Sequence, residues 1–468
     1  MTTPLDTSPL RIAVPPKVRR LCQTLADAGH RSWVVGGVVR DLLLAQLRGE
    51  SEPAVPGDWD LATDARPEHV VQLFRRVVPT GIQHGTVTVM LGKDGFEVTT
   101  LRGETTYSDG RHPDQVYYVD DIAEDLSRRD FTINAIAYDP LSDVLIDPHG
   151  GQRDLAEGVL RAVGNAEERF SEDGLRALRA ARFVATLEMD LDPATERAIG
   201  PSLSSYAKVS AERIRDEWVK ALMARAPSRA FEVMRRTGLL AVSAPELIEL
   251  HGIEQNRFHA HDVWQHTMEC LDHCPARPMV RLAGLLHDIG KPETRAFSEK
   301  TNDHTFYDHE QRGAELADAL LRRLRFSNTE RAHVVHLVRH HLVVYDESWT
   351  DAAVRRWLRR VTPELAEDVL ALSRADILAK GRDPTDELAR VDALRERLDA
   401  VIAEGTALTV RDLAINGNDL HHELGIEPGP VMGTVLRALL DEVTDQPQIN
   451  ERAVLLARAR DLLACRDG

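Results

Sequence analysis

The feature that most restricts the fold of this chain is a short apolar run that ends in two glycines and leads, after one helical stretch, to two acidic residues one position apart. The run covers Trp33 to Val35, the glycines are Gly36 and Gly37, and the acidic pair is Asp58 and Asp60. Residues i and i+2 of a strand point to the same face of a sheet, so these two carboxylates would lie together, as the hard, octahedral Mg²⁺ ion requires. The pattern predicts a strand, a tight turn and a helix that lead to a paired-carboxylate metal site.

The glycine pair also predicts a place for phosphate groups. Glycine lets backbone N–H groups approach a phosphate closely, and the N-terminus of the next helix, which carries Arg40, favours negative charge. Gly36, Gly37 and Arg40 are therefore candidate nucleotide-binding residues, and Asp58 and Asp60 are candidate catalytic ligands of Mg²⁺. A triphosphate cradle beside two metal-binding carboxylates indicates nucleotidyl-transfer chemistry.

Strand-like and helical patterns divide the chain near residue 154. Before this point, two strand-like runs at 86–91 and 96–100 are separated by a Gly-Lys-Asp-Gly turn, which is typical of a hairpin. Glu97 lies in the second run and becomes a third candidate catalytic carboxylate if the hairpin lies beside the strand of the acidic pair. After this point, amphipathic helical spacing dominates. We therefore predict an α+β fold with a nucleotidyltransferase head of mixed sheet and helices at 1–155, a helical neck and body at 156–250, a histidine-rich helical module at 251–380 and a helical tail at 381–468.

Two later segments carry charged residues in informative patterns. The first reads R-R-D-F-T-I-N-A at 128–135 and includes Arg129, Asp130 and Asn134. A basic pair beside an acid is by itself weak evidence, because a surface ion pair gives the same pattern.

In the second segment, Asp173, Arg176, Arg179 and Arg182 recur every three residues, so neighbours in the series stay adjacent on a helix. An exposed basic face with ion pairs is one interpretation. The other is that an Asp acceptor and an Arg donor on consecutive turns imitate the edge of a base, so that C or A is admitted and G or U is rejected.

Together, these segments resemble the motifs of the DNA polymerase β-like nucleotidyltransferases, specifically the bacterial (class II) tRNA CCA-adding enzymes and poly(A) polymerases. The resemblance covers roughly residues 30–380. It implies a polymerase β-like head in which two Mg²⁺ ions activate the RNA 3′-hydroxyl and neutralise the leaving pyrophosphate.

The resemblance also implies roles for single residues. Arg129 would contact the triphosphate and Asp130 the sugar. Asp173 and Arg176 would read the incoming base in place of a template. Two later arginines, Arg179 and Arg182, would help to hold the nucleotide.

Two connecting segments bear on this resemblance. The connection Arg48–Gly57 is longer than the compact turn of the family, and we interpret it as a surface insertion, which loops tolerate well. The polar segment from Leu101 to Pro113 resembles the flexible loop that CCA-adding enzymes use when they switch from CTP to ATP. An ordinary connecting loop is the alternative; if the resemblance holds, it argues against an enzyme that adds only C.

Histidines are concentrated in one part of the chain, since 12 of the 19 lie between His251 and His341. The adjacent pair His287-Asp288 follows an apolar helical run. One buried histidine is usually an ordinary core residue, but that interpretation does not explain this density of histidines. Neutral imidazoles with carboxylates suit a transition metal such as Mn²⁺, Ni²⁺ or Fe²⁺.

This pattern resembles the HD phosphohydrolase domain, with His266, the His-Asp pair, His309, then His340 or His341, and finally an aspartate. The resemblance implies a set of metal ligands: His266, His287, Asp288 and Asp376. It also implies residues for a second metal or for phosphate: His309, His340 and Lys291.

Composition restricts the setting in which the chain works. Hydrophobic residues make up 43% and charged residues 28%, and no apolar run approaches the roughly 18–20 residues that span a bilayer. We see no secretory signal pattern at the N-terminus, and the four cysteines form no C-x-x-C pair, so we expect reduced thiols, no membrane partner and a cytoplasmic location.

The leading prediction is a CCA-adding tRNA nucleotidyltransferase that extends the tRNA 3′ end from CTP and ATP and carries a fused HD domain. The net charge of −17 disfavours sequence-blind RNA binding but leaves a tRNA partner open. A poly(A) polymerase shares the motifs and is the nearest competing interpretation, although a basic tail for arbitrary RNA is absent. The sequence is also compatible with an HD phosphohydrolase that has a vestigial head, and with an RNA-binding scaffold. The oligomeric state is not predicted.

Overall fold

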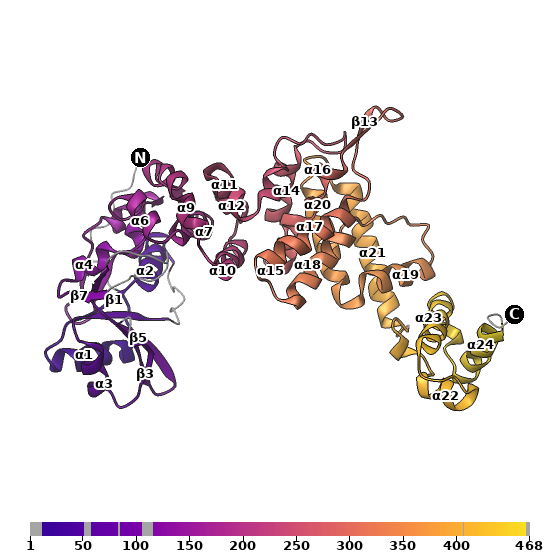
Figure 1. Cartoon of the computed structure of the whole chain (residues 1–468), viewed down its shortest axis with the longest axis horizontal. Coiled ribbons are helices and arrows are strands. Elements are labelled where there is room, and N and C mark those ends of the chain that lie inside the picture. The colour runs from indigo at the N-terminus through magenta and orange to yellow at the C-terminus, as the bar shows by residue number, and fades with distance from the viewer. Residues whose placement is uncertain (1–11, 51–57, 83–84, 105–115, 406, 465–468) are drawn as a thin grey trace. The chain divides into compact units, whose positions relative to one another are not determined.

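The computed structural model describes residues 12–50, 58–82, 85–104, 116–405 and 407–464 (Figure 1). The chain divides into two compact units, residues 1–245 and 246–468, and each is described by itself. This division falls a few residues before the boundary that we expected after residue 250, and the expected boundaries after 155 and 380 stay predictions. Within the described residues, none of the helices has both the length and the apolar character that a membrane-spanning segment needs.

A seven-stranded mixed sheet organises the first unit, in the order β3-β4-β5-β2-β1-β8-β9. β2 runs parallel to β5, and the other neighbouring pairs are antiparallel. The hairpin β4–β5, which the turn chemistry predicted, therefore lies beside the strand that begins at Asp60. The strands of this sheet are β1 (Ser32–Val35), β2 (Asp60–Thr63), β3 (Val77–Gly81), β4 (Thr86–Leu91), β5 (Asp94–Thr100), β8 (Ala137–Asp139) and β9 (Val144–Ile146).

Helices surround this sheet and continue beyond it. The first shows why they form: Val18, Leu21, Cys22 and Leu25 occupy positions i, i+3, i+4 and i+7 of α1 and are completely buried. Burial of each such leucine contributes roughly 2 kcal/mol. The helices of this unit are α1 (Pro16–Asp27), α2 (Gly37–Leu47), α3 (Pro67–Leu73), α4 (Ile122–Ser127), α5 (Gly151–Glu157), α6 (Ala166–Glu172), α7 (Leu175–Thr186), α8 (Pro193–Arg197), α9 (Leu203–Tyr206), α10 (Ala211–Leu222), α11 (Ser228–Thr237) and α12 (Leu239–Ser243).

The expectation that strands end near residue 154 is wrong in detail. Two-residue strands β10 (Val159–Leu160) and β11 (Asp190–Leu191) pair in parallel, and β12 (Ala296–Ser298) pairs with β13 (Asp303–Thr305) in the second unit. Such short ladders carry too few alternating residues for a periodicity of two to be recognised.

The two connecting segments singled out in the sequence lie partly outside the described residues. Residues 51–57 of the Arg48–Gly57 insertion and residues 105–113 of the polar segment are among those not described. The described flanks of the polar segment pair as β6 (Arg102–Glu104) and β7 (Val116–Tyr118).

The second unit is mainly helical. α14 packs against α15 and α20, and α17 packs against α18. The last three helices share a separate apolar core that includes Leu420, Leu439 and Leu455. The helices are α14 (Val263–His273), α15 (Pro278–Leu286), α16 (Lys291–Thr294), α17 (His309–Arg323), α18 (Asn328–His340), α19 (Asp351–Val361), α20 (Ala366–Leu378), α21 (Thr385–Ala403), α22 (Gly417–Leu424), α23 (Pro430–Asp445) and α24 (Arg452–Ala464), while α13 (Pro245–Ile248) spans the division.

Candidate functional site

The turn between β1 and α2 requires glycine at its first position. Gly36 has φ 79°, a conformation that side chains disfavour. A Cβ atom there would lie 3.2 Å from Arg129 Nη1 and 3.9 Å from Asp60 Oδ2. The missing side chain therefore lets the backbone approach both an arginine and a candidate metal ligand, which is the arrangement that a phosphate cradle needs.

The three candidate catalytic carboxylates lie near one another, on two adjacent central strands of the sheet and on the segment that leads into one of them. Asp60 opens β2 directly opposite Glu97 of β5, and Asp58 lies two residues earlier on the same chain segment. Partial desolvation and the neighbouring Glu97 and Asp58 charges raise the pKa of Asp60 to about 6, against the lowering effect of Arg129. The mutual repulsion of these groups fits a site for a divalent cation.

The three carboxylates do not form a closed metal site. In the described part of the chain, the groups of candidate ligands whose atoms all lie within 4.8 Å of one another are in the second unit, and the Asp58, Asp60 and Glu97 set is not among them. The fold thus brings the three carboxylates near one another, and the assignment of Mg²⁺ to them stays a proposal.

Arg129 is held in place by an acidic residue that the sequence reasoning missed. Asp125 of α4 is 1% exposed, and its carboxylate lies 2.9 Å from Arg128 Nη2 and 3.4 Å from Arg129 Nη2. Because both arginines converge on one buried carboxylate, the guanidinium of Arg129 is fixed at the pocket. Asp125 lies three residues before Arg128 and four before Arg129 on a helical stretch. This spacing is the signal that could have identified Asp125.

Asp130 is saturated with donors. Its Oδ1 accepts from the Phe131 N–H and from Asn134 Nδ2, both at 2.9 Å, and its Oδ2 accepts from Arg179 Nε at 2.8 Å. Burial alone would raise its pKa, but Arg179 and Asn134 hold the pKa of Asp130 at about 2. This carboxylate therefore organises the site, and a contact with a sugar would have to share its lone pairs.

The acidic residue of the predicted base-reading series is not on the helix that carries its arginines. Asp173 follows α6 in an extended conformation, and its Oδ1 accepts from the backbone N–H of Leu175, where α7 begins. The expectation of one continuous helix is thus wrong at this residue, because Asp173 caps α7 from outside. Arg176 lies on the first turn of α7, so the two side chains remain neighbours.

Arginines of α2 and α7 lie around one aromatic ring. The guanidinium groups of Arg40, Arg179 and Arg182 lie 5.1, 5.3 and 4.0 Å from the centre of the Phe183 ring. Stacking on the ring lets three like charges share a small volume.

α10 supplies two partners that the sequence analysis did not single out. Arg213 Nη2 donates to Asp173 Oδ2 at 2.8 Å, and the buried carboxylate of Glu217 lies 2.7 Å from Arg182 Nε. Despite Glu217, burial lowers the pKa of Arg182 to about 10. The i, i+4 spacing of Arg213 and Glu217 put them on one helix face, but nothing local showed which face meets the site.

The residues predicted for the nucleotide gather around one pocket of about 510 Å³. Seven arginines and three aspartates line it, so it is strongly cationic in a chain of net charge −17. Asp58 and Glu97 are not among the lining residues. The predicted residues in the lining are Gly36, Gly37, Arg40, Asp60, Arg129, Asp130, Asp173, Arg176, Arg179 and Arg182.

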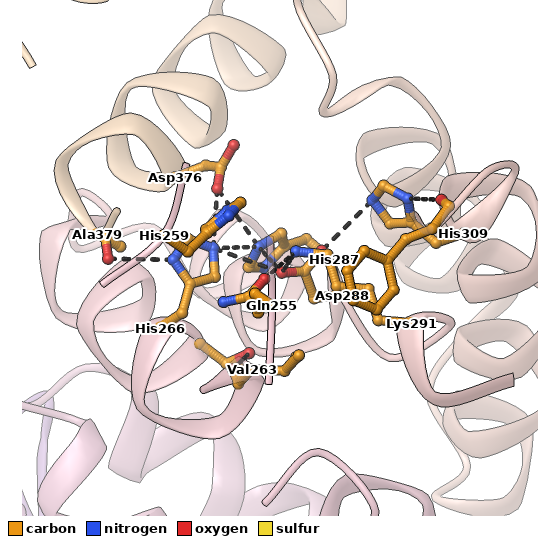
Figure 2. Close-up of polar contacts among 12 residues, drawn as sticks. Gln255, His259, Val263, His266, His287, Asp288, Lys291, His309, Asp376 and Ala379 are labelled. Atoms are coloured by element: carbon orange, nitrogen blue, oxygen red, sulfur yellow. Dashed lines mark hydrogen bonds and ion pairs between the residues drawn. The ribbon is translucent and has the colours of Figure 1, made fainter. Parts of the chain in front are cut away.

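In the second unit, the predicted metal ligands face one another (Figure 2). His266 Nε2 lies 3.2 Å from His287 Nε2 and 2.9 Å from Asp376 Oδ1. Both histidines are completely buried. His266, His287 and Asp376 form the first of the two candidate ligand groups in the described chain.

A second group lies beside the first. Asp288, His309 and His341 have ligand atoms within 4.8 Å of one another. Asp288 Oδ2 lies 3.1 Å from His287 Nε2, and its Oδ1 lies 3.4 Å from His309 Nε2. One carboxylate thus faces both groups with different oxygens, as a bridging ligand would.

The prediction of His340 at this second group is wrong, and His341 takes that place. His340 is half-buried, stacks on His336 and lines a different pocket. Val334, Leu337, Val338 and His341 follow the i, i+3, i+4, i+7 pattern of the buried face of α18, and this phase could have distinguished the two histidines.

Backbone carbonyls fix the orientation of all four histidines. A carbonyl only accepts, so Nδ1 of each ring must donate to it, and a neutral ring then directs the lone pair of Nε2 at the cluster. Neighbouring Nε2 atoms that lie about 3 Å apart and both carry lone pairs suit a shared cation. The pairs, with their distances, are His266 with Ala379 (3.1 Å), His287 with Gly284 (2.8 Å), His309 with Phe306 (2.7 Å) and His341 with Val338 (2.7 Å).

Charges inside this cluster are strongly coupled. Burial alone would lower the pKa of His287, but Asp288 and Asp376 raise it to about 9, so a metal ion must displace a proton there. Lys291, predicted to contact a phosphate, lies 2.7 Å from Asp288 Oδ2 and donates to Gln255 Oε1 at 2.6 Å. The donor set therefore fits a transition-metal site with an adjacent cation.

Comparison with known proteins agrees with the nucleotidyltransferase motifs of the chain. Three protein families match the chain: "Poly A polymerase head domain" at residues 32–161, "Probable RNA and SrmB-binding site of polymerase A" at 188–250 and "tRNA nucleotidyltransferase domain 2, putative" at 307–459. The CCA-adding enzyme of Lactiplantibacillus plantarum is 33% identical over 443 residues, which cover 94% of each chain.

Other relatives match more strongly over less of their length. The CCA-adding enzyme of Lactobacillus johnsonii is 46% identical over 213 residues, so the match spans 46% of this chain and 51% of that protein. A crystal structure of the Bacillus stearothermophilus CCA-adding enzyme in complex with CTP has a TM-score of 0.72 and 28% identity, and the match covers 97% of this chain and 99% of that one.

Proposed function

The chain belongs to the family of bacterial CCA-adding enzymes and poly(A) polymerases, and we propose that it adds C, C and A to the 3′ end of tRNA from CTP and ATP. The observation that carries this proposal is the single pocket in which a phosphate cradle, phosphate-binding arginines and a base-sized set of donors and acceptors meet. The relatives named for CCA addition support it further. Such substrates would place the enzyme in the cytoplasm.

In this proposal, each part of the pocket has one task. Mg²⁺ held at Asp58 and Asp60, with Glu97 beside them, would act as a Lewis acid on the attacking hydroxyl and the leaving pyrophosphate. Arg40 and Arg129 bind the triphosphate beside the glycine turn. The fixed arginine positions cost no reorganisation when the nucleotide binds.

The base would be read by the pair at the start of α7. Asp173 offers acceptor lone pairs and Arg176 offers N–H donors, a combination that matches the amino group and ring nitrogen of C or A. Arg213 holds Asp173, and Glu172 Oε2 accepts from Arg176 Nη1 at 2.6 Å, so both readers are held before nucleotide arrives. Preorganised readers discriminate because a wrong base would direct a donor at the arginine or an acceptor at the aspartate.

Nucleotide selectivity tests this reading. The wild-type chain, given tRNA without its CCA end, should incorporate CTP and ATP and exclude GTP and UTP. Asp173→Ala should lose this discrimination while it retains Mg²⁺ binding, because Asp173 pairs with Arg213 and with the Leu175 N–H and is not one of the proposed Mg²⁺ ligands. Equal use of the four nucleotides by the wild type would overturn the proposal. A long A tract instead of C-C-A would favour a poly(A) polymerase.

A second candidate function belongs to the second unit. We propose a metal-dependent phosphohydrolase site of the HD type at the two ligand groups joined by Asp288. A bound Mn²⁺, Ni²⁺ or Fe²⁺ would supply a Lewis acid and lower the pKa of a water molecule. The chain's own residues would hold the ester: Lys291 offers a cation, and the buried histidines exclude other ligands.

Metal analysis tests this second candidate. Protein purified without chelator should hold a transition metal, as measured by inductively coupled plasma mass spectrometry, and His266→Ala together with His287→Ala should abolish it. Absence of metal, even after incubation with excess Mn²⁺ or Ni²⁺, would refute the site.

A further inference from the structure

A cavity of about 430 Å³ lies over the ligand cluster of the second unit. Asp288, His309 and His341 contribute to its floor, so a phosphate bound at the cluster would project the rest of its ester into this space. The volume lies within the range of roughly 300–1,000 Å³ that is usual for small-molecule sites. The cavity is therefore sized for a compact ester.

Two aromatic side chains at this cavity are unusually exposed. Tyr307 is 80% exposed and Phe258 is 57% exposed, and both belong to the cavity lining. Aromatic side chains that line a cavity next to a polar cluster are candidate binding residues. Leu342, which is 47% exposed, adds to the same rim.

One hydrogen bond ties the segment of Phe258 to β13, and a second one lies within the segment. The backbone N–H of Arg257 donates to Asp303 Oδ2 of β13 at 3.1 Å, and the N–H of Phe258 donates to Asn256 Oδ1 at 3.2 Å. The Arg257 guanidinium lies 5.2 Å from the centre of the Phe258 ring. The Phe258 ring thus lies beside the Arg257 cation, on a segment that is hydrogen-bonded to β13.

Tyr307 directly follows an anchored residue, Phe306. Phe306 is 9% exposed, and its carbonyl accepts from His309 Nδ1 at 2.7 Å. Lys291 Nζ lies 5.5 Å from the centre of the Phe306 ring. The backbone next to Tyr307 is therefore tied directly to a ligand of the cluster, which holds the base of this side chain close to the proposed phosphate site.

We propose that Phe258 and Tyr307 are specificity-determining residues that stack on the planar ring of a phosphate ester, so that this site takes a nucleotide rather than a sugar phosphate or inorganic phosphate. The proposal rests on the second proposed function, because the phosphate is placed at the ligand cluster. Stacking on aromatic side chains tolerates any base, since every base has a π face, so the selection would be for a ring and not for its identity.

Binding measurements test the proposal independently of catalysis. The full chain, loaded with Mn²⁺ and carrying Arg129→Ala and Arg176→Ala to silence the first unit, would be titrated calorimetrically with adenosine 5′-monophosphate, ribose 5-phosphate and inorganic phosphate. We expect the nucleotide to bind about 10-fold more tightly than ribose 5-phosphate, within the range measured for stacking on an aromatic residue.

Variants in the same background locate the effect. Tyr307→Leu and Phe258→Leu should each weaken nucleotide binding about 5-fold and leave ribose 5-phosphate within about twofold. Phe297→Leu is the matched control, because Phe297 is 58% exposed but does not line the cavity. It should change neither affinity.

The outcomes separate the two proposals. Equal affinities for nucleotide and ribose 5-phosphate, no binding of either, or an equal loss in the Phe297→Leu control would overturn the aromatic assignment. Nucleotide preference that needs Tyr307 and Phe258 would support it, even if no ester is hydrolysed and the phosphohydrolase function fails. Hydrolysis of both esters without preference would leave that function standing and overturn the assignment of the two rings.

Discussion

Replacement of Asp130 by asparagine tests whether a buried carboxylate, rather than the glycine turn alone, organises the nucleotide pocket. Asp130 is 8% exposed and accepts from Arg179 and Asn134. These partners lower its pKa from 3.8 to about 2. Each pKa unit corresponds to about 1.4 kcal/mol, so loss of the charge should cost the first unit on the order of 2 kcal/mol of unfolding free energy at neutral pH.

The pH dependence gives the sign of this effect. The folded-state pKa of Asp130 is depressed, so its stabilising contribution is fully present above the unfolded value of 3.8 and is lost as the pH falls through about 2. The difference between the wild type and Asp130→Asn should therefore be constant from pH 5 to 7 and should shrink below pH 4. A group with a raised pKa would show the opposite trend.

Differential scanning calorimetry measures the difference, with the transition of the first unit identified by its shift on addition of CTP. About 2 kcal/mol corresponds to a decrease in Tm of roughly 4–8 °C for a unit of this size. Asp190→Asn is the matched control, because Asp190 also pairs with an arginine, at 2.9 Å, but is 91% exposed. Its effect should stay within about 0.5 kcal/mol. Equal effects of the two replacements, or a difference that persists at pH 2, would refute the reasoning.

Replacements at four further positions test other parts of the account. Glu217→Gln should cost about 3 kcal/mol or more of unfolding free energy, measured by the same calorimetry, because it leaves Arg182 buried without its charge partner. Arg213→Gln should raise misincorporation of GTP and UTP in primer-extension assays, because Asp173 loses the donor that holds it. His341→Ala should lower the metal content, as measured by mass spectrometry, whereas the equivalent change at His340 should leave it unchanged; the reverse result would overturn the choice between the two histidines.

Short-range patterns predicted the framework of the head. A glycine after an apolar strand and a two-residue spacing of carboxylates are local properties, and the register of β2 against β5 then placed Glu97 opposite Asp60. Period-two and period-3.6 patterns likewise separated the mixed sheet from the helical remainder. These features could be predicted from the sequence because each is determined by a few neighbouring residues.

Partners that depend on packing could not be predicted in the same way. Asp173 lies outside α7 because its carboxylate caps that helix, a choice that spacing alone did not reveal. Arg213 reaches it from a helix far along the chain. His340 was preferred to His341 because two adjacent histidines look alike in a motif, although only one continues the buried face of α18.

The most direct measurement for the central claim is the sequence of the 3′ ends that the purified chain produces. A tRNA that ends before its C-C-A triplet would be incubated with Mg²⁺ and all four nucleotides, and the products would be sequenced. The account predicts ends that stop after C-C-A and no extension when Asp58 and Asp60 are both replaced by alanine. Unlimited addition of A, addition of G or U, or unchanged products from the double replacement would contradict it.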